Sequence, residues 1–161
     1  MSRGRELGAG IALAVFVLDQ ISKFVVLHGF VVTNSEPTRI LPFLDLTLRL
    51  NPGISFSFFP QQTVSGVALL LTFTLAATTL LGVWLWRTRS LLIGAGLGAI
   101  IGGAFGNAFD RLVYGAVVDF LDFHIAGRHF FVFNLADAAI NVGVALLLLE
   151  SALGGRAAKT A

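Results

Sequence analysis

Four long runs of apolar residues divide the chain, and each is close to the roughly 20 residues that an α-helix needs to cross a bilayer core. They predict membrane helices at about residues 8–27, 63–86, 91–109 and 137–153. The first run follows a basic start, so a signal peptide is the alternative interpretation. Because Asp19, Gln20 and Lys23 interrupt this run and no small-residue cleavage site follows it, we interpret it as a retained helix.

The segment between the first two runs alternates with a period of two, as half-buried strands do. Leucines alternate with polar residues over 44–50, and the Asn-Pro-Gly sequence at 51–53 is typical of a turn. Apolar residues then alternate with serines over 54–58. We predict a small β-hairpin within about residues 40–60, in which turn formation alone is sufficient to explain Asn51.

A second polar segment, the loop over 110–134, separates the last two predicted helices. Apolar and polar residues alternate over 117–124, and Ala126-Gly127 follows as a turn. The predicted fold class is an all-α integral membrane protein with four transmembrane helices and a small extracytoplasmic β-hairpin or sheet element. We expect a single domain over residues 1–161.

Composition agrees with a membrane protein. The chain is 56% hydrophobic and 12% charged, whereas soluble domains are about 45–50% apolar and about 25% charged. The net charge of +2 and the pI of about 9.7 do not indicate a nucleic-acid partner, because the basic residues form no aromatic-laced patch. The absence of cysteine excludes disulfides and a cysteine nucleophile. Three histidines show no ligand spacing, so we expect neither a metal nor another cofactor.

Basic residues at the helix ends predict the orientation in the membrane. In a four-helix chain, three basic pairs fall on one side: Arg3 and Arg5, Arg87 and Arg89, Arg156 and Lys159. By the positive-inside rule this side is cytoplasmic. Both termini are then cytoplasmic, and residues 28–62 and 112–133 face outward.

The third apolar run carries a ridge of small residues. Glycine recurs every fourth residue, at Gly94, Gly98, Gly102 and Gly106. In lipid, such ridges let a second helix approach closely. The ridge continues into Asp110, and a neighbouring strip carries Asn107 and Arg111, so the packed side of this helix is expected to end in polar residues.

Two acids near the outer surface are the candidate catalytic residues. Asp119 lies in an apolar strand with no basic neighbour in sequence. Asp137 has a structural explanation, because Asn134 as N-cap would make it the N3 acid of a capping box. Asp110 beside Arg111 is interpreted as a structural charge cluster. Since acids at a membrane edge are costly, we hypothesise that Asp119 and Asp137 meet as an aspartyl protease pair.

Asp19 and Lys23 are four residues apart and can pair on one helix face. One interpretation is a self-neutralised pair near the helix end, with Lys23 extending to the interface. The other is a role in the site, since ionisable residues inside the membrane are candidates for function.

Four ordered motifs resemble those of the lipoprotein signal peptidases, also called signal peptidase II. They are Asp19-Gln-Ile-Ser-Lys23, Asn51-Pro-Gly-Ile-Ser-Phe56, Gly102-Gly-Ala-Phe-Gly-Asn-Ala-Phe-Asp-Arg111 with Gly115 to Asp122, and Phe133-Asn-Leu-Ala-Asp-Ala-Ala-Ile140. The resemblance runs from the first helix to the fourth. It implies a bacterial inner-membrane aspartic endopeptidase that cuts prolipoproteins just before a diacylglyceryl-modified cysteine.

The resemblance also assigns residues. It places catalysis at Asp119 and Asp137. The positions that support the site or contact substrate are Asp19, Lys23, Asn51, Gly53, Asn107, Asp110, Arg111 and Asn134. The expected partners are prolipoproteins and membrane lipid, and we expect the protein to act as a monomer.

Two neighbouring carboxylates would share one proton, with one acting as base on water and the other as acid on the scissile carbonyl. We hypothesise that Asp137, at a helix N-terminus, holds the charge and that Asp119 holds the proton. One rival is a serine protease in which Lys23 activates Ser22, Ser55 or Ser57. The other is a proton or ion carrier that uses the acids as relay groups.

Overall fold

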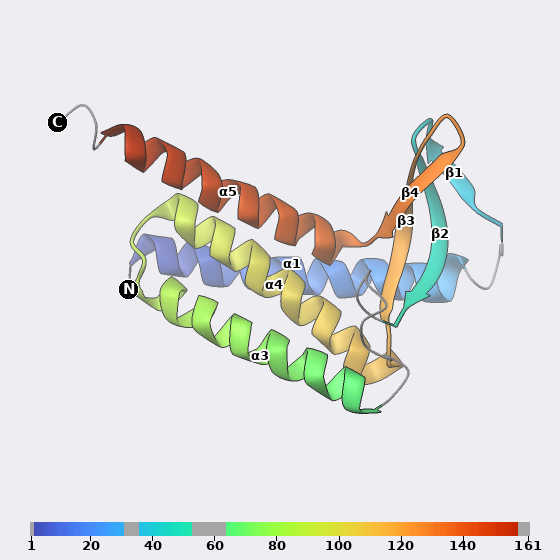
Figure 1. The fold of residues 1–161 in the computed structure, drawn as a ribbon, viewed down its shortest axis with the longest axis horizontal. Coiled ribbons are helices and arrows are strands. Elements are labelled where there is room, and N and C mark those ends of the chain that lie inside the picture. Colours follow the sequence, from blue (N-terminus) through green and yellow to red (C-terminus); the bar gives the residue numbers. More distant parts are fainter. Residues whose placement is uncertain (1, 31–35, 53–63, 158–161) are drawn as a thin grey trace.

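The computed structural model describes residues 2–30, 36–52 and 64–157. Along the chain its elements are α1 (Arg3–Val25), the π-helical turn η1 (Val26–Phe30), β1 (Thr38–Leu41), β2 (Leu44–Asn51), α3 (Val64–Arg87), α4 (Leu91–Tyr114), β3 (Val117–Ile125), β4 (Arg128–Phe133) and α5 (Leu135–Ala157). Four of the helices are long and apolar enough to cross a membrane. Figure 1 shows the sheet at one end of the helices and the start of α1 and the end of α5 at the other.

Helix α4 is the centre of the bundle, packed mainly against α1 and α5 and less against α3. The predicted glycine ridge faces α1. A Cβ atom at Gly94 or Gly98 would collide with the backbone of α1 at Gly4 or Gly8. On its other side, Gly103 meets the backbone of Ala136 in α5. Small residues therefore bring backbones into direct contact, as the ridge predicted.

The sheet is antiparallel throughout, in the order β1-β2-β3-β4. The predicted strand over 117–124 is confirmed, and the turn after it lies at Ala126 (φ 50°) and Gly127 (φ 78°). The leucine-rich strand at 44–50 is also confirmed, with β1 on one side and β3 on the other. The predicted hairpin partner at 54–58 lies outside the described residues.

Several predicted helix ends were wrong. Helix α1 begins at Arg3 rather than residue 8, and helical backbone continues through η1 into residues predicted to be non-helical. Helix α4 continues to Tyr114 instead of ending at 109, so Asp110 and Arg111 belong to a helix and not to the loop. It ends where Gly115 adopts φ 71° and donates its backbone N–H to the Arg111 carbonyl. Asn107 and Asp110 therefore lie on the buried face of α4, and the helix continues beyond them.

Candidate active site

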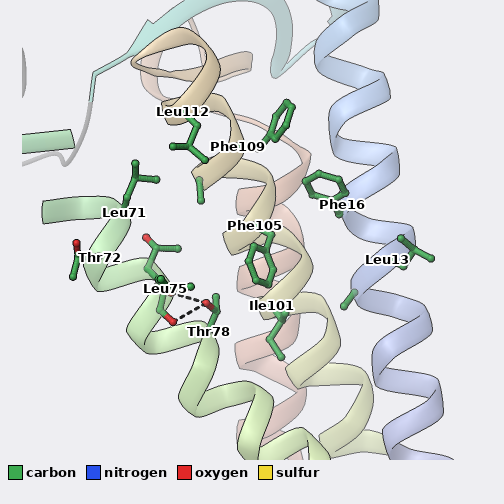
Figure 2. Close-up of a pocket in the computed structure, with 13 residues that line it drawn as sticks. Leu13, Phe16, Leu71, Thr72, Leu75, Thr78, Ile101, Phe105, Phe109 and Leu112 are labelled. Carbon is green, nitrogen blue, oxygen red and sulfur yellow. Dashed lines mark hydrogen bonds between the residues drawn. The ribbon is translucent and has the colours of Figure 1, made fainter. Parts of the chain in front are cut away.

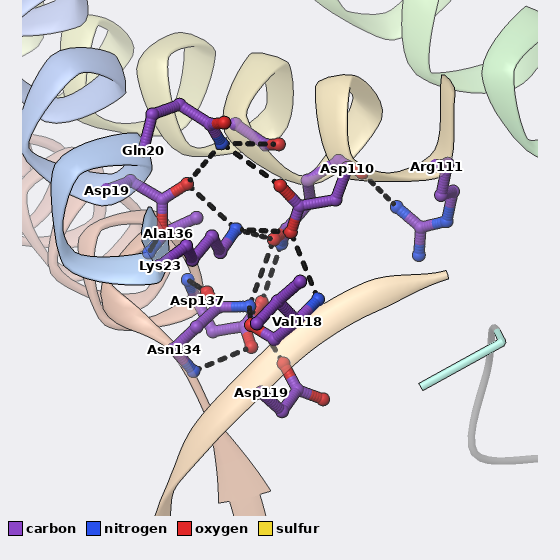
Figure 3. Close-up of polar contacts among 12 residues, drawn as sticks. Asp19, Gln20, Lys23, Asp110, Arg111, Val118, Asp119, Asn134, Ala136 and Asp137 are labelled. Atoms are coloured by element: carbon purple, nitrogen blue, oxygen red, sulfur yellow. Dashed lines mark hydrogen bonds and ion pairs between the residues drawn. The ribbon is translucent and has the colours of Figure 1, made fainter. Parts of the chain in front are cut away.

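Polar side chains converge where α1, α4, α5 and the sheet meet (Figure 3). Each helix or strand supplies its side chains to this group from one of its ends or one of its faces. Figure 3 labels Asp19, Gln20 and Lys23 of α1, Asp110 and Arg111 of α4, Asp119 of β3, and Asn134 and Asp137 at the start of α5. Hydrogen bonds add Asn51 of β2 and Asn107 of α4 to the group.

Lys23 is fully enclosed and lies between two carboxylates. Its Nζ is 2.8 Å from Asp19 Oδ2 and 2.7 Å from Asp110 Oδ2, and it donates to Asn107 Oδ1 at 3.1 Å. Gln20 Nε2 donates to Asp19 at 3.1 Å and to Asp110 at 3.0 Å. Buried charges require such partners. The predicted Asp19–Lys23 pair is confirmed, and the interpretation that Lys23 extends to the interface is wrong, because Lys23 is 1% exposed.

Asp110 ties the end of α4 to the sheet. Its Oδ2 accepts from the backbone N–H of Val118 in β3 at 3.0 Å. This is the structural link interpreted from the sequence, but its closest cation is Lys23 and not the adjacent Arg111. Arg111 donates from Nη1 to the Asn107 carbonyl at 3.1 Å, and the charges of Asp137, Asp110 and Asp119 act on its guanidinium.

Asn134 connects the two candidate catalytic acids. Its Nδ2 donates to Asp119 Oδ1 at 2.8 Å, and its Oδ1 accepts from the backbone N–H of Asp137 at 2.9 Å. In return, Asp137 Oδ2 accepts from the Asn134 backbone N–H at 3.3 Å, so the predicted capping box is confirmed. The other oxygen of Asp137 accepts from Asn107 Nδ2 at 2.8 Å. Asp137 therefore caps its helix and also faces the polar network.

Asp119 is buried, with 3% exposure. Burial raises the pKa of its carboxyl to about 6, and the negative charge of Asp137 acts in the same direction. Hydrogen bonds from Asn51 Nδ2 to Oδ2 at 3.0 Å and from Asn134 to Oδ1 oppose this shift of the pKa. A carboxyl with a pKa near 6 can hold a proton in mildly acidic solution, which an ordinary aspartate cannot.

Every predicted site residue in the described part of the chain belongs to this one network, whereas Gly53 lies outside the described residues. Gln20 belongs to it but was not predicted as a site residue. Its position next to Asp19 in an apolar helix was the available signal, since an amide inside a membrane needs a partner.

The serine alternative has little support. Ser22 Oγ donates to the Asp19 carbonyl at 2.7 Å, whereas Lys23 Nζ contacts Asp19, Asp110 and Asn107, so Ser22 and Lys23 do not form a nucleophile–base hydrogen bond. Ser55 and Ser57 lie outside the described residues. Within the described residues, no three His, Asp or Glu side chains are arranged to hold a metal ion.

An apolar groove of about 670 Å³ lies between α1, α3 and α4 (Figure 2). Leu13 and Phe16 of α1, Leu75 of α3 and Phe105 of α4 are part of its lining. The lining continues along α4 to Leu112, the residue after Arg111. The groove therefore extends to the part of α4 that carries the polar network.

Four helices are long and apolar enough to cross a membrane. Two carboxyl groups lie where the bundle meets the sheet and are linked through asparagine side chains. Together these features define a polytopic membrane protein equipped for general acid–base chemistry. A family model described as signal peptidase (SPase) II matches residues 11–153. The chain belongs to the signal peptidase II family and is a peptidase.

Relatives and a solved structure agree with this assignment. The lipoprotein signal peptidase of Beijerinckia indica subsp. indica is 48% identical over 147 residues, which cover 91% of this chain and 88% of the relative. The lipoprotein signal peptidase of Methylocella silvestris is 46% identical over 156 residues, which cover 97% of this chain and 91% of that relative. A bacterial membrane enzyme solved at 1.9 Å superposes with a TM-score of 0.76 at 25% identity, covering 89% of this chain and 90% of the other.

Proposed function

We propose that this chain removes the signal peptide from bacterial prolipoproteins by cutting before the diacylglyceryl-modified cysteine, with Asp119 and Asp137 as the catalytic pair. The observation that carries the proposal is the connection of the two acids through Asn134. One amide side chain donates to the carboxylate of Asp119 and caps the helix that presents Asp137.

The two acids take different roles. Asp119 is the proposed acid: its pKa is raised to about 6, and its protonated form donates a hydrogen bond to the scissile carbonyl. Asp137 lies at the N-terminus of α5, where the helix dipole stabilises a carboxylate. It takes a proton from water as the water oxygen attacks the carbonyl carbon. The tetrahedral intermediate then collapses: Asp137 gives this proton to the amine nitrogen of the cysteine as the C–N bond breaks, and the signal peptide is left with a new carboxyl group. Two carboxyl groups and a water are sufficient for this sequence without a metal or another cofactor.

Lys23 and its partners support the pair and do not take part in the reaction. Two carboxylates compensate the single ammonium group, and Asp19 Oδ1 also accepts from the Ala136 backbone N–H at 2.9 Å. This contact fixes the first turn of α5, one residue before Asp137. Asp19, Lys23 and Asp110 are therefore positioning residues for the pair.

The apolar groove is suited to the membrane-embedded part of the substrate. A signal peptide has an apolar segment of about 7–15 residues, and the groove is apolar from Leu13 to Leu112. A chain lying in it would approach the polar network from within the bilayer, while the lipid on the cysteine stays in the membrane.

The proposed location is the bacterial inner membrane, with both termini cytoplasmic and the site at the outer face. The start of α1 with Arg3 and Arg5, and the end of α3 with Arg87 followed by Arg89, lie opposite the sheet, which supports this orientation. We propose that the protein acts as a monomer, since the two acids come from one chain. Reporter fusions that place residues 112–133 in the cytoplasm would contradict the orientation.

Incubation of the purified protein with a lipidated prolipoprotein tests the activity. Wild type should release the signal peptide and the Asp119→Asn variant should not. The carrier alternative makes the opposite prediction: proteoliposomes would show pH-dependent ion flux without proteolysis.

A further inference from the structure

The end of the bundle opposite the sheet gathers arginines that the proposed peptide hydrolysis does not use. Arg3 and Arg5 lie in the first turn of α1, Arg87 ends α3, and Arg89 lies in the connection to α4. Arg3, Arg87 and Arg89 are exposed, and Arg5 is half-buried.

Close packing holds these arginines in one corner. Ser2 Oγ donates to the Thr88 carbonyl at 2.7 Å, which fastens the start of α1 to the α3–α4 connection. Gly4 lies directly against the backbone of Arg89 and Ser90, where a Cβ atom would collide. The arginines on either side of Gly4 are therefore neighbours of those that flank Thr88.

The described acids balance the positive charge of this corner only in part, because Glu6 in the first turn of α1 and Glu150 of α5 are two carboxylates beside four arginines. None of the four arginines forms an ion pair with a carboxylate of the described residues. Of the nine acids in the chain, seven fall between Asp19 and Asp137. Glu150 accepts a hydrogen bond from Ser90 Oγ at 2.7 Å and forms no ion pair with these arginines.

Arg5 is held in a defined orientation. Its Cζ lies 4.2 Å from the ring centroid of Trp86, a cation–π contact. Its Nε is buried and has no hydrogen-bond partner among the described residues. Trp86 itself is 68% exposed, and exposed tryptophans at helix ends lie at the headgroup level of a bilayer.

We propose that this corner, formed by Arg3, Arg5, Trp86, Arg87 and Arg89, binds the phosphate headgroup of an anionic phospholipid. The planar guanidinium group matches two oxygens of a phosphate, and basic sites between membrane helices attract acidic lipid headgroups. A free phosphate offers the same chemistry. A lipid is favoured because exposed apolar side chains adjoin the arginines, namely those of Leu7, Val83 and Leu91.

The test is thermal stability and native mass spectrometry of the purified protein in detergent with phosphatidylglycerol or phosphatidylcholine added. Wild type should retain phosphatidylglycerol and be stabilised by it, and should respond less to phosphatidylcholine. The double variant Arg5→Ala/Arg87→Ala should bind phosphatidylglycerol at least about tenfold more weakly, because it loses two charged hydrogen-bond donors to the phosphate. If that variant does not fold, Arg5→Lys/Arg87→Lys should fold and still bind more weakly, because lysine lacks the planar fork.

A matched control removes the same charge elsewhere. Arg39→Ala/Arg128→Ala changes two exposed arginines of the sheet and should leave phosphatidylglycerol binding within about twofold of wild type. Equal losses in the two alanine double variants, or wild-type binding by the variants at Arg5 and Arg87, would overturn the site. Equal stabilisation by inorganic phosphate at the same concentration would show a free-anion site and overturn the lipid assignment.

Discussion

Asn134 and Asp137 hydrogen-bond each other's backbone, with Asp137 N–H donating to Asn134 Oδ1 at 2.9 Å and Asn134 N–H donating to Asp137 Oδ2 at 3.3 Å. The reciprocal pair fixes the start of α5. Because Asn134 also donates to Asp119, the cap and the candidate catalytic pair depend on the same side chain.

Variants at position 134 can separate these two roles. Asn134→Ala should lose the cap, at about 0.5–2 kcal/mol of stability, and most of the cleavage activity. Asn134→Ser keeps a capping oxygen but cannot reach Asp119 with an amide, so it should be more stable than the alanine variant and equally impaired in cleavage. Melting temperature and cleavage rate measured on both variants check this. Normal cleavage by Asn134→Ser would show that Asn134 serves the helix alone.

Asp119→Asn and Asp137→Asn should each abolish detectable cleavage while leaving a folded membrane protein. Asparagine has the same size and can hydrogen-bond, but it neither takes a proton from water nor gives one to a carbonyl. The expected loss is at least about 10²–10⁴-fold. The double variant should be little worse than either single one, because the two acids act as a unit.

Asp110→Asn is the comparison for these two variants. It weakens the pairing with Lys23, so it should reduce folding yield more than it reduces the rate per folded molecule. Near-wild-type cleavage by either the Asp119 or the Asp137 variant would refute the catalytic pair.

The raised pKa of Asp119 predicts a pH dependence of stability. A carboxyl whose folded-state pKa lies above its unfolded value of 3.8 stabilises the fold most when protonated. This contribution is complete below about pH 4 and is lost as the pH rises through about 6. Melting temperature should therefore fall between pH 4.5 and 7.5 more steeply in wild type than in Asp119→Asn. Identical slopes for the two proteins would contradict the shift.

Gly98→Leu and Gly102→Leu should destabilise the bundle strongly. A side chain at either position would meet the α1 backbone, at Gly8 or at Ala12. Gly10→Leu and Gly82→Leu are matched controls, because a Cβ at these helical positions has nothing within 4 Å. The controls should be neutral or slightly stabilised, since leucine is the better helix former by roughly 1 kcal/mol. Equal melting temperatures in detergent for all four variants would show that the ridge is not packed.

Filling the groove should weaken substrate binding. Ala108→Trp places a large ring among the groove residues, and Val142→Trp adds the same ring to an exposed position of α5 outside it. We expect KM for the lipidated prolipoprotein to rise by about tenfold in the first, which corresponds to about 1.4 kcal/mol, with kcat little changed. The second variant should resemble wild type. Equal KM values would place the substrate elsewhere.

Local signals in the sequence predicted the elements and several contacts. The four-residue glycine spacing indicated the helix contact, and the spacing of Asn134 and Asp137 indicated the capping box. The leucine alternation indicated β2. Each of these is a relation between residues close in sequence, where periodicity alone defines the geometry.

Relations between distant residues were not predictable from pattern. Nothing in the sequence selects Asp110 as the second partner of Lys23, because that depends on how α1 and α4 are aligned. The pairing of β2 with both β1 and β3 likewise depends on the tertiary fold. The end of α4 was misplaced because a charged residue in a membrane helix was interpreted as its boundary, whereas Asp110 is completely buried.

Asp19 in the first membrane helix accepts a hydrogen bond from the backbone of Ala136 in the last, across 117 residues of sequence. During synthesis, the hydrogen bonds of Asp19 with Ala136 and of Asn107 with Asp137 therefore cannot form until the final helix has been made. A nascent chain that ends before residue 134 contains Asp119 but neither Asn134 nor Asp137. Membrane insertion of the fourth helix thus both closes the bundle and assembles the proposed pair. If these two acids are the catalytic ones, a partly made peptidase cannot cleave other proteins of the membrane.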